Sequence, residues 1–224
     1  MKKNKLICVK DDISVFTLLK LGEYEKVARL ISYNEINVNT VDGVGNDLVT
    51  KLLKARQYDL VLEVMKKRNW DVNHQNDDGN TFSHVLAQDN SIMAMKVVEQ
   101  LVKKKKYVPN IRNNRGETAM DIAVSNHYLC TAFKILEDKR FDNIDIFSFK
   151  NLLNVILKSK VYGKYSKITN LNIIVTNLEK KNLDFKVKEI VDAIRNNMDI
   201  IKNDIMNNRL FNLEMIINYS YAID

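Results

Sequence analysis

Two aspartates and a histidine within eight residues are the strongest candidates for chemistry in this sequence. They lie in the stretch NDDGNTFSHVLAQDN, residues 76–90, where Asp77 and Asp78 precede Gly79 and His84 follows. Carboxylate and imidazole groups are common metal ligands and acid–base groups, so this stretch could form a metal site or a catalytic cluster. The same residues also fit one module of a repeating structural scaffold. The remainder of the chain decides between these two interpretations.

Composition limits the class of protein. The chain has 224 residues, 46% of them hydrophobic, with one proline and six glycines, and this scarcity of helix breakers predicts a mainly helical fold. Cys8 and Cys130 are too few and too far apart for a disulfide framework or a zinc site, which favours a reduced, intracellular compartment. No apolar run has the length of a signal peptide or of a membrane-spanning helix. We therefore expect a cytoplasmic chain with no membrane partner.

The positive charge of the chain is spread along its length. The net charge is +7, from 35 Lys and Arg against 28 Asp and Glu, and the one dense run is Lys103–Lys106. Proteins that bind nucleic acid usually concentrate their charge on one face, so we expect a solvated surface and no nucleic-acid partner. The alternative function is a basic protein that binds nucleic acid through Lys103–Lys106 and the lysine-rich C-terminal third.

A pattern of turns and helices repeats along the first two thirds of the chain. The segments that start VNTVDG, VNHQND and PNIRNN align, so that Gly45 falls on Gly79 at a spacing of 34 residues. Gly116 follows Gly79 by 37 residues, which indicates an insertion of three. Each glycine lies in a polar turn that two apolar stretches of helical periodicity follow, as in residues 82–87 and 92–101. A pair of short helices cannot bury its apolar faces alone, so neighbouring repeats must stack.

This pattern resembles the ankyrin repeat in its length, its turn glycine, its threonine before the first helix and its helix pair. The clearest copy is DDGNTFSHVLA. Thr118 is kept in the next copy, but Asp121 stands where the family usually has histidine, and Asp47 and Thr50 take the threonine and histidine places in the copy before. The usual proline after the threonine is missing. Over about residues 11–145, the resemblance implies an all-α fold, an ankyrin-repeat solenoid of stacked helix pairs with short hairpin-like fingers.

The resemblance also gives the opening stretch a structural role. It implies that Thr81 caps the first helix and that His84 hydrogen-bonds within the turn and ties it to its neighbour. Asp77 and Asp78 then lie at the tip of a finger, where a metal ion would need further ligands and where Arg115 of the next repeat would oppose a cation. We therefore expect no metal site, no cofactor and no catalytic residue, in a protein that is not an enzyme.

The C-terminal third is predicted to continue the array. Residues 1–145 hold about four repeats, whereas residues 146–224 lose the turn signature but keep amphipathic helical patterns at residues 147–160, 171–181, 187–205 and 210–220, with a helix–loop–helix junction at NNMDII. Terminal repeats are commonly atypical because they cap the array, so we expect about two degenerate repeats capping the same solenoid. A separate helical domain that binds a partner is the alternative, although no Pro-, Gly- or Ser-rich linker separates the two regions.

Two further features concern packing. Large apolar residues recur at one repeat position, Ile36, Trp70, Tyr107 and Phe141, and are predicted to form core between repeats. The three inserted residues are predicted to lengthen the second helix of their repeat by about one turn. Lys103–Lys106 would then lie at its C-terminal end, where cations suit the helix dipole.

The resemblance implies a scaffold that binds another protein through its finger tips and first helices. The candidate contact residues are Thr40, Val41 and Val44 in one finger, Gln75, Asp77, Asp78 and Asn80 in the next, Arg112, Asn114, Arg115 and Glu117 in the third, and Lys51, Ala55, Val85, Asp89, Ile122 and Asn126 on the inner helices. The change from acidic to basic fingers indicates a partner of mixed charge. The richness in Asn, Ile and Lys is similar to that of degenerate ankyrin arrays of large DNA viruses, poxvirus-like or giant, which implies a host-interaction protein in the host cytoplasm. Comparable arrays of some intracellular bacteria and protists are the alternative.

Overall fold

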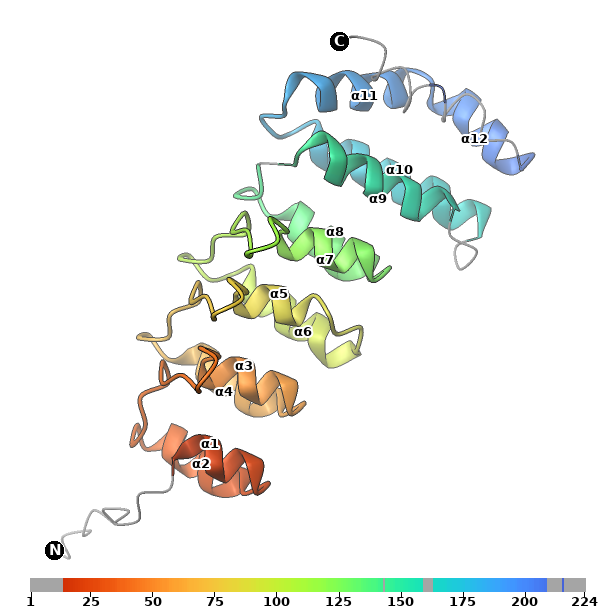
Figure 1. Ribbon diagram of the computed structural model, residues 1–224. Helices are drawn as coiled ribbons and strands as arrows, with labels where there is room; N and C mark the ends of the chain where they lie inside the picture. The colour runs from red at the N-terminus through yellow and green to blue at the C-terminus, as the bar shows by residue number, and fades with distance from the viewer. Residues whose placement is uncertain (1–13, 143, 159–162, 209–214, 216–224) are drawn as a thin grey trace, which may run out of the picture. The chain divides into compact units, whose positions relative to one another are not determined.

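The computed structural model describes residues 14–142, 144–158, 163–208 and 215, and every regular element in these ranges is a helix (Figure 1). The chain divides into two compact units, residues 1–71 and residues 72–224. The helices of the first unit are α1 (Val15–Lys20), α2 (Tyr24–Ser32), α3 (Leu48–Lys54) and α4 (Tyr58–Lys66). The helices of the second unit are α5 (Phe82–Leu86), α6 (Ile92–Leu101), α7 (Ala119–Ser125), α8 (Leu129–Glu137), α9 (Ile146–Lys158), α10 (Lys164–Leu178), α11 (Phe185–Asn196) and α12 (Met198–Met206).

The helices of the first unit form two stacked pairs. Helix α1 packs on α2 and α3 on α4, while α1 also contacts α3 and α2 contacts α4. Trp70 is buried at the end of this unit, and its indole Nε1 donates a hydrogen bond to Asp47 Oδ2 at 3.3 Å. Each pair therefore buries its apolar faces against its neighbour, as the repeat pattern predicts.

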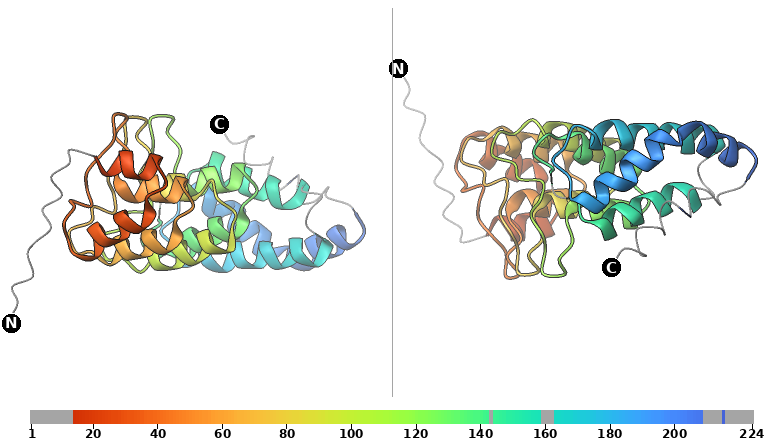
Figure 2. Two further views of the ribbon diagram at one scale, coloured as in Figure 1. Left: turned by 90° about the horizontal axis from the view of Figure 1, so that it is seen from below. Right: turned by 90° about the horizontal axis from the view of Figure 1, so that it is seen from above.

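The second unit stacks four helix pairs around one core. Helix α7 packs on α5 and α9, and α8 packs on α6 and α10, so that first helices contact first helices and second helices contact second helices. The core cluster includes buried residues from Ala87 to Ile205. Helices α11 and α12 pack against α9 and α10 and cover one end of the unit (Figure 2). The prediction of an all-α fold of stacked helix pairs is confirmed.

Polar caps determine where the first helices of the repeats begin. Thr118 Oγ1 accepts a hydrogen bond from Asp121 N at 3.3 Å, and Asp121 Oδ2 accepts one from Thr118 N at 2.9 Å. This reciprocal capping box satisfies two backbone donors that the first turn of α7 leaves unpaired. Asp47 caps α3 in the same place, because its Oδ1 accepts from Thr50 N at 2.9 Å. The predicted correspondence of these threonine and aspartate positions is confirmed.

The connections from a second helix to the next first helix are of two kinds. Three long ones, which we call fingers, span residues 33–47, 67–81 and 102–118. Residues 138–145 and 179–184 make much shorter connections in the same positions of the C-terminal pairs. Isolated antiparallel bridges close the first two fingers, between Val41 and Asp47 and between Gln75 and Thr81. The hairpin-like fingers that the resemblance implies are therefore present in the repeats before α7 and absent after it, within the described residues.

Two packing predictions have different outcomes. Trp70, Tyr107 and Phe141 are buried, which confirms their place in the core, and Ile36 is half-buried. The predicted extra helical turn is wrong: α6 has 10 residues, against 9 in each of α4 and α8. Most of the insertion lengthens the turn after the helix, and Lys103–Lys106 follow α6 instead of ending it. Like charges on successive residues disfavour a helix that would bring several of them close together.

The C-terminal patterns correspond to α9 through α12. The break predicted at NNMDII is confirmed, because α11 ends at Asn196 and α12 starts at Met198. Helix α10 begins at Lys164, seven residues before the apolar stretch at Leu171 that predicted it. The helix predicted over residues 210–220 lies outside the described residues except for Met215. None of the described helices combines the length and apolar character that crossing a membrane requires.

Candidate interaction surface on the fingers

Each finger tip is a tight turn that one side chain organises. Asn76 Oδ1 accepts hydrogen bonds from the backbone N–H groups of Asp78, at 3.1 Å, and Asn80, at 2.9 Å. Asp42 and Asn113 make the same pair of bonds in the other two fingers. Such side-chain to backbone bonds rigidify turns. We did not predict this role from the sequence, although the three residues share the 34- and 37-residue spacing of the turn glycines.

A second set of asparagines joins each finger-bearing repeat to the next. Asn73 Oδ1 accepts from Val108 N at 2.9 Å, and Asn73 Nδ2 donates to Lys106 O at 2.7 Å. Within the first compact unit, Asn39 makes an equivalent pair of bonds with backbone groups that lie 30 and 32 residues further along the chain. Asn110 donates to the backbone of the turn after α8. Part of the asparagine content of this sequence therefore serves the stacking of the repeats.

The second and third fingers are hydrogen-bonded to each other near their tips. Asn114 N donates to Asp78 O at 3.0 Å, and Asn114 Nδ2 donates to Asp77 O at 2.9 Å. Gly79 has φ +73° at this contact, and a Cβ added to it would lie 2.5 Å from Asn114 Oδ1. The turn therefore requires glycine both for its backbone conformation and for the approach of the next finger. Asn114, a candidate contact residue, stabilises the finger pair.

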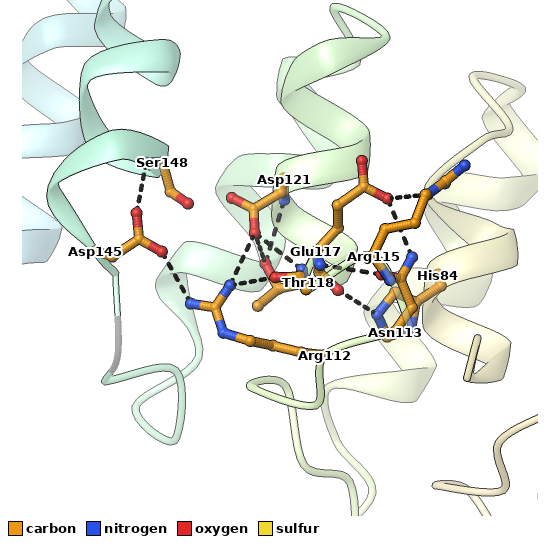
Figure 3. A network of polar contacts seen from close by, with 10 residues as sticks. His84, Arg112, Asn113, Arg115, Glu117, Thr118, Asp121, Asp145 and Ser148 are labelled. Atoms are coloured by element: carbon orange, nitrogen blue, oxygen red, sulfur yellow. Dashed lines mark hydrogen bonds and ion pairs between the residues drawn. The ribbon is translucent and has the colours of Figure 1, made fainter. Parts of the chain in front are cut away.

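His84 has the structural role that the resemblance implies. Its Nδ1 accepts from Thr81 N at 3.1 Å, which leaves the proton on Nε2 to be donated to Glu117 O of the next repeat at 3.0 Å (Figure 3). The side chain is 1% exposed, and burial lowers the pKa of His84, outweighing the hydrogen bond to Glu117 that raises it. Both ring nitrogens are engaged with the backbone, so the neutral imidazole has no free lone pair for a metal ion.

Metal-binding groups do not converge elsewhere in the part of the chain that the structure describes. No three His, Cys, Asp or Glu side chains in these ranges lie close enough together to hold a metal ion. Cys130 is a free, exposed cysteine. His127 lies in the turn between α7 and α8 with φ +61°.

Arg112 links the third finger to the start of α9. Its guanidinium donates from Nη2 to Asp145 Oδ2 at 2.9 Å and from Nη1 to Gly116 O at 2.5 Å, and it lies 3.8 Å from Asp121 Oδ2 (Figure 3). Asp145 Oδ1 in turn accepts from Ser148 N at 2.7 Å, within the first turn of α9. Burial raises the pKa of Asp145, but the hydrogen bonds from Ser148 and Arg112 more than offset this, so the pKa is lowered overall. Arg112 therefore stabilises the structure, in addition to being a candidate contact residue.

Two more candidate residues take part in bonds between fingers. Gln75 Nε2 donates to Gly79 O at 2.7 Å and to Arg112 O at 3.2 Å. Asn80 Oδ1 accepts from Asn113 Nδ2 at 3.0 Å. Side chains that bridge neighbouring fingers hold the tips in a common arrangement, so a substitution here would alter the shape of the surface as well as its chemistry.

The inner-helix candidates differ in how accessible they are. Val85 is half-buried on α5, whereas Ile122 is 5% exposed on α7 and contributes to the core. Asp89 and Asn126 lie in the turns that follow α5 and α7, not on the helices themselves. Asn126 Nδ2 donates back to Ile122 O at 2.9 Å. The accessible inner surface of these two repeats is therefore smaller than the sequence pattern suggested.

The first finger carries its own set of candidates. Lys51 Nζ lies 3.0 Å from Asp42 Oδ2, and Ala55 caps the C-terminal end of α3. Burial raises the pKa of Asp42, but the bonds from Lys51 and from the turn backbone lower it to about 2. Thr40 is half-buried beside this turn, whereas Val41 is exposed.

The side chains that remain open to a partner lie at the finger tips. Asp77 and Asp78 are exposed, and their carboxylates form no ion pair with the described residues. The side chain of Arg115 is 70% exposed and lies 2.8 Å from a carboxylate oxygen of Glu117. Val44 is exposed at the tip of the first finger. Rigid turns thus present acidic, basic and apolar groups on different fingers.

Comparison with known proteins supports the fold. No protein-family model matches the sequence, and no curated protein matches it either. Among solved structures, the chain is similar to the crystal structure of EF0377, an ankyrin repeat protein, with a TM-score of 0.55 and 16% sequence identity over 78% of this chain and 83% of that chain. At this level of identity the likeness shows the fold alone. The fold of this chain is that of ankyrin repeat proteins.

Proposed function

We propose that this chain is a non-enzymatic ankyrin-repeat scaffold that binds another protein through its finger tips and the accessible parts of its first helices. The observation that carries the proposal is the contrast between backbone and side chains at the tips. The turns are held by hydrogen bonds of Asp42, Asn76 and Asn113, while the carboxylates of Asp77 and Asp78 stay exposed without an ion pair to the described residues. A rigid turn loses little conformational freedom when a partner binds its side chains.

The non-enzymatic part of the proposal rests on how the reactive groups are used. His84, which is the buried histidine of the opening stretch, bonds with both ring nitrogens to the backbone. Asp77 and Asp78 lie on exposed turns, whereas groups that exchange protons in catalysis are usually desolvated or paired with another charged group. These residues have the properties of structural and surface groups.

We further propose that residues 146–224 are degenerate repeats that cap the array. Support comes from α9 packing on α7, from α10 packing on α8, and from the buried residues that both regions contribute to one core. Helix α11 also presents Lys186, Lys188 and Glu189 to solvent, in keeping with the polar outer face that a capping repeat needs.

A finer proposal concerns the biological setting. The richness of the sequence in Asn, Ile and Lys and the ankyrin-repeat fold support a host-interaction protein of a large DNA virus, acting in the host cytoplasm. Isolation of the partner from extracts of candidate host cells, with identification by mass spectrometry, tests this setting. Failure to recover a partner from any of these extracts would contradict the proposed setting.

Charge reversal at one finger tests the binding surface. The variant Asp77→Lys/Asp78→Lys changes exposed side chains and keeps the backbone bonds of the tip, so its stability should change by about 0.5 kcal/mol or less. If these residues lie centrally in the interface, recovery of the native partner in a pull-down should fall at least about tenfold, since central contacts contribute about 2 kcal/mol or more. Arg112 is unsuitable for such a test because its reversal would also break the bond to Asp145.

The matched control is Glu189→Lys/Asp199→Lys, which makes the same change in net charge on exposed residues of α11 and α12. This control should recover the partner as the unaltered chain does, with circular dichroism confirming that both variants are folded. Equal loss of the partner by both variants would attribute the effect to net charge. Full recovery by the finger variant would contradict the proposed surface.

A further inference from the structure

Exposed lysines lie in the turns that follow three successive second helices of the second compact unit. The turns that follow α6, α8 and α10 span residues 102–107, 138–142 and 179–182, and these helices end on the same side of the unit (Figure 1). We call the exposed lysines of these turns the basic edge. They are Lys103, Lys105, Lys106, Lys139 and Lys180.

Direct hydrogen bonds make the three turns neighbours. Arg140, in the second turn, donates from Nη2 to Val102 O and from Nη1 to Lys104 O, each at 2.6 Å. Lys181, in the third turn, donates from Nζ to Asp138 O at 2.8 Å. The lysines of the basic edge therefore follow one line across three repeats, although they are far apart in the sequence.

At the ends of α6 and α8, the structural need for a cation is met by other residues. A helix C-terminus carries partial negative charge and unpaired carbonyl groups, which a nearby cation stabilises. Arg140 and Lys181 already supply such cations, and Arg140 also pairs with Asp138 and lies over the Tyr107 ring at 5.5 Å. The five lysines of the basic edge form no ion pair with the described residues. Their positive charge exceeds what the fold requires.

We infer that the basic edge binds an extended, acidic segment of another protein. Packed helices lie about 8–10 Å apart, so successive turns should present lysines at about that interval. A chain in the extended polyproline II conformation rises about 3.1 Å per residue with three residues per turn, so acidic side chains at every third residue lie on one face and recur at about 9 Å. Each turn can then pair with one carboxylate, since the long lysine side chains adjust their positions easily. This surface is separate from the finger tips and does not depend on them.

An acidic protein segment fits this edge better than nucleic acid does. Single strands are held largely by stacking on exposed aromatic rings, but Tyr107 and Phe141, the aromatic residues of these turns, are buried. Arg140, the arginine that would suit a phosphate best, is engaged with backbone and carboxylate oxygens.

Binding of a defined acidic peptide tests the inference. The probe is a fluorescent peptide with glutamate at every third position, titrated with the full chain at about 50 mM salt. The test variant is Lys103→Gln/Lys106→Gln/Lys139→Gln/Lys180→Gln. The matched control replaces four exposed lysines of the same unit that lie elsewhere, Lys96, Lys158, Lys186 and Lys188, with glutamine.

The unaltered chain should bind the peptide, and the dissociation constant should rise at least about tenfold for the test variant and about twofold or less for the control. Equal weakening by the two variants, or no binding by the unaltered chain, would overturn the inference. A duplex DNA probe that binds more tightly than the peptide, and is lost with the same four lysines, would overturn it in favour of a nucleic-acid surface. The finger variant Asp77→Lys/Asp78→Lys should bind the peptide at least as tightly as the unaltered chain, which separates this test from that of the proposed function.

Discussion

The finger-bearing repeats of the second unit and its C-terminal helix pairs both stack their helices, but they are stabilised in different ways. Helices α5 and α7 have only five and seven residues, whereas α9 and α10 have 13 and 15. Helices as short as the first two are unstable alone. Residues 72–142 add bonds from side chains to the backbone of the next repeat, as at Asn73 and His84. Residues 144–208 instead have long helices and short connections.

The two regions also differ in which buried residues stabilise them and in what they present to solvent. In the finger-bearing repeats, buried polar residues such as Thr81, His84 and Asn113 hold the fingers in place. In the C-terminal pairs, the long helices bury rows of leucine, isoleucine and valine. The first arrangement presents rigid polar turns to solvent, and the second closes the end of the core. The comparison therefore predicts that apolar truncation is most damaging in the second region, and that polar or glycine substitutions matter most in the first.

The largest effect should come from a cavity in the C-terminal region. Leu152 is fully buried on α9, and Leu152→Ala should lower the free energy of unfolding by about 2–5 kcal/mol, through lost transfer energy and an unfilled cavity. Denaturant unfolding followed by circular dichroism measures this loss. The control on the same helix is Phe147→Ala, whose side chain is 80% exposed and whose loss should change stability by about 0.5 kcal/mol or less. Equal effects of the two substitutions would contradict the burial pattern of α9.

A glycine substitution should reveal the contact between fingers. Gly116→Ala meets only the strain of positive φ, at +76° with no atom within 4 Å, and should cost about 1–2 kcal/mol. Gly79→Ala has the same strain and also brings its Cβ against Asn114 N, at 2.8 Å, so it should cost about 1 kcal/mol more. Thermal unfolding of both variants provides the comparison. A cost for Gly79→Ala no larger than that for Gly116→Ala would argue against the packing of Asn114 on this turn.

A smaller loss is expected from His84→Ala. The substitution removes hydrogen bonds to Thr81 and Glu117, and one such bond has a net value of about 1 kcal/mol. We therefore expect a loss of about 1 kcal/mol or somewhat more near pH 8, measured by denaturant unfolding. Purified unaltered protein should contain no stoichiometric zinc or iron. Metal that is present and is removed by this substitution would contradict the structural role of His84.

The stability contributed by His84 should depend on pH. Burial lowers its pKa in the folded state below the ordinary value of 6.5, so both folded and unfolded chains hold the neutral ring at higher pH. Below about pH 6.5 the unfolded chain takes up a proton that the folded chain resists, and the unaltered protein loses stability. The difference in unfolding free energy between this protein and His84→Ala should therefore shrink between about pH 8 and about pH 5.5. A constant difference over this range would contradict the buried, neutral histidine.

The sequence predicted local features better than long-range ones. The helix positions at 82–86 and 92–101 follow from periodicity. The caps at Asp47 and Thr118 follow from the resemblance to the ankyrin repeat, because these residues take its threonine place and act on their own neighbours in the chain. The bond between Arg112 and Asp145 joins residues 33 positions apart, so its existence depends on how repeats stack.

Two other differences between the sequence-based prediction and the structure also arise from contacts between repeats. The inserted residues before Tyr107 lie mostly in a turn, which Arg140 of the following repeat holds by its bonds to Val102 O and Lys104 O. Ile122 matched a surface position in the repeat pattern but lies in the core of the second unit. Periodicity identifies the apolar face of a helix, whereas the area that remains accessible depends on the neighbouring repeats.

Photo-crosslinking is the most direct test of which region of the second unit, the fingers or the C-terminal helix pairs, binds the partner. A photoreactive side chain is placed at Asp78 in one variant, on the second finger, and at Phe147 in another, in the C-terminal region where no finger is present. Both positions are exposed. After irradiation in extract of the native cell, we predict a covalent adduct with one partner protein from position 78 and none from position 147. The same partner joined at position 147, with no adduct at position 78, would contradict the assignment of binding to the fingers.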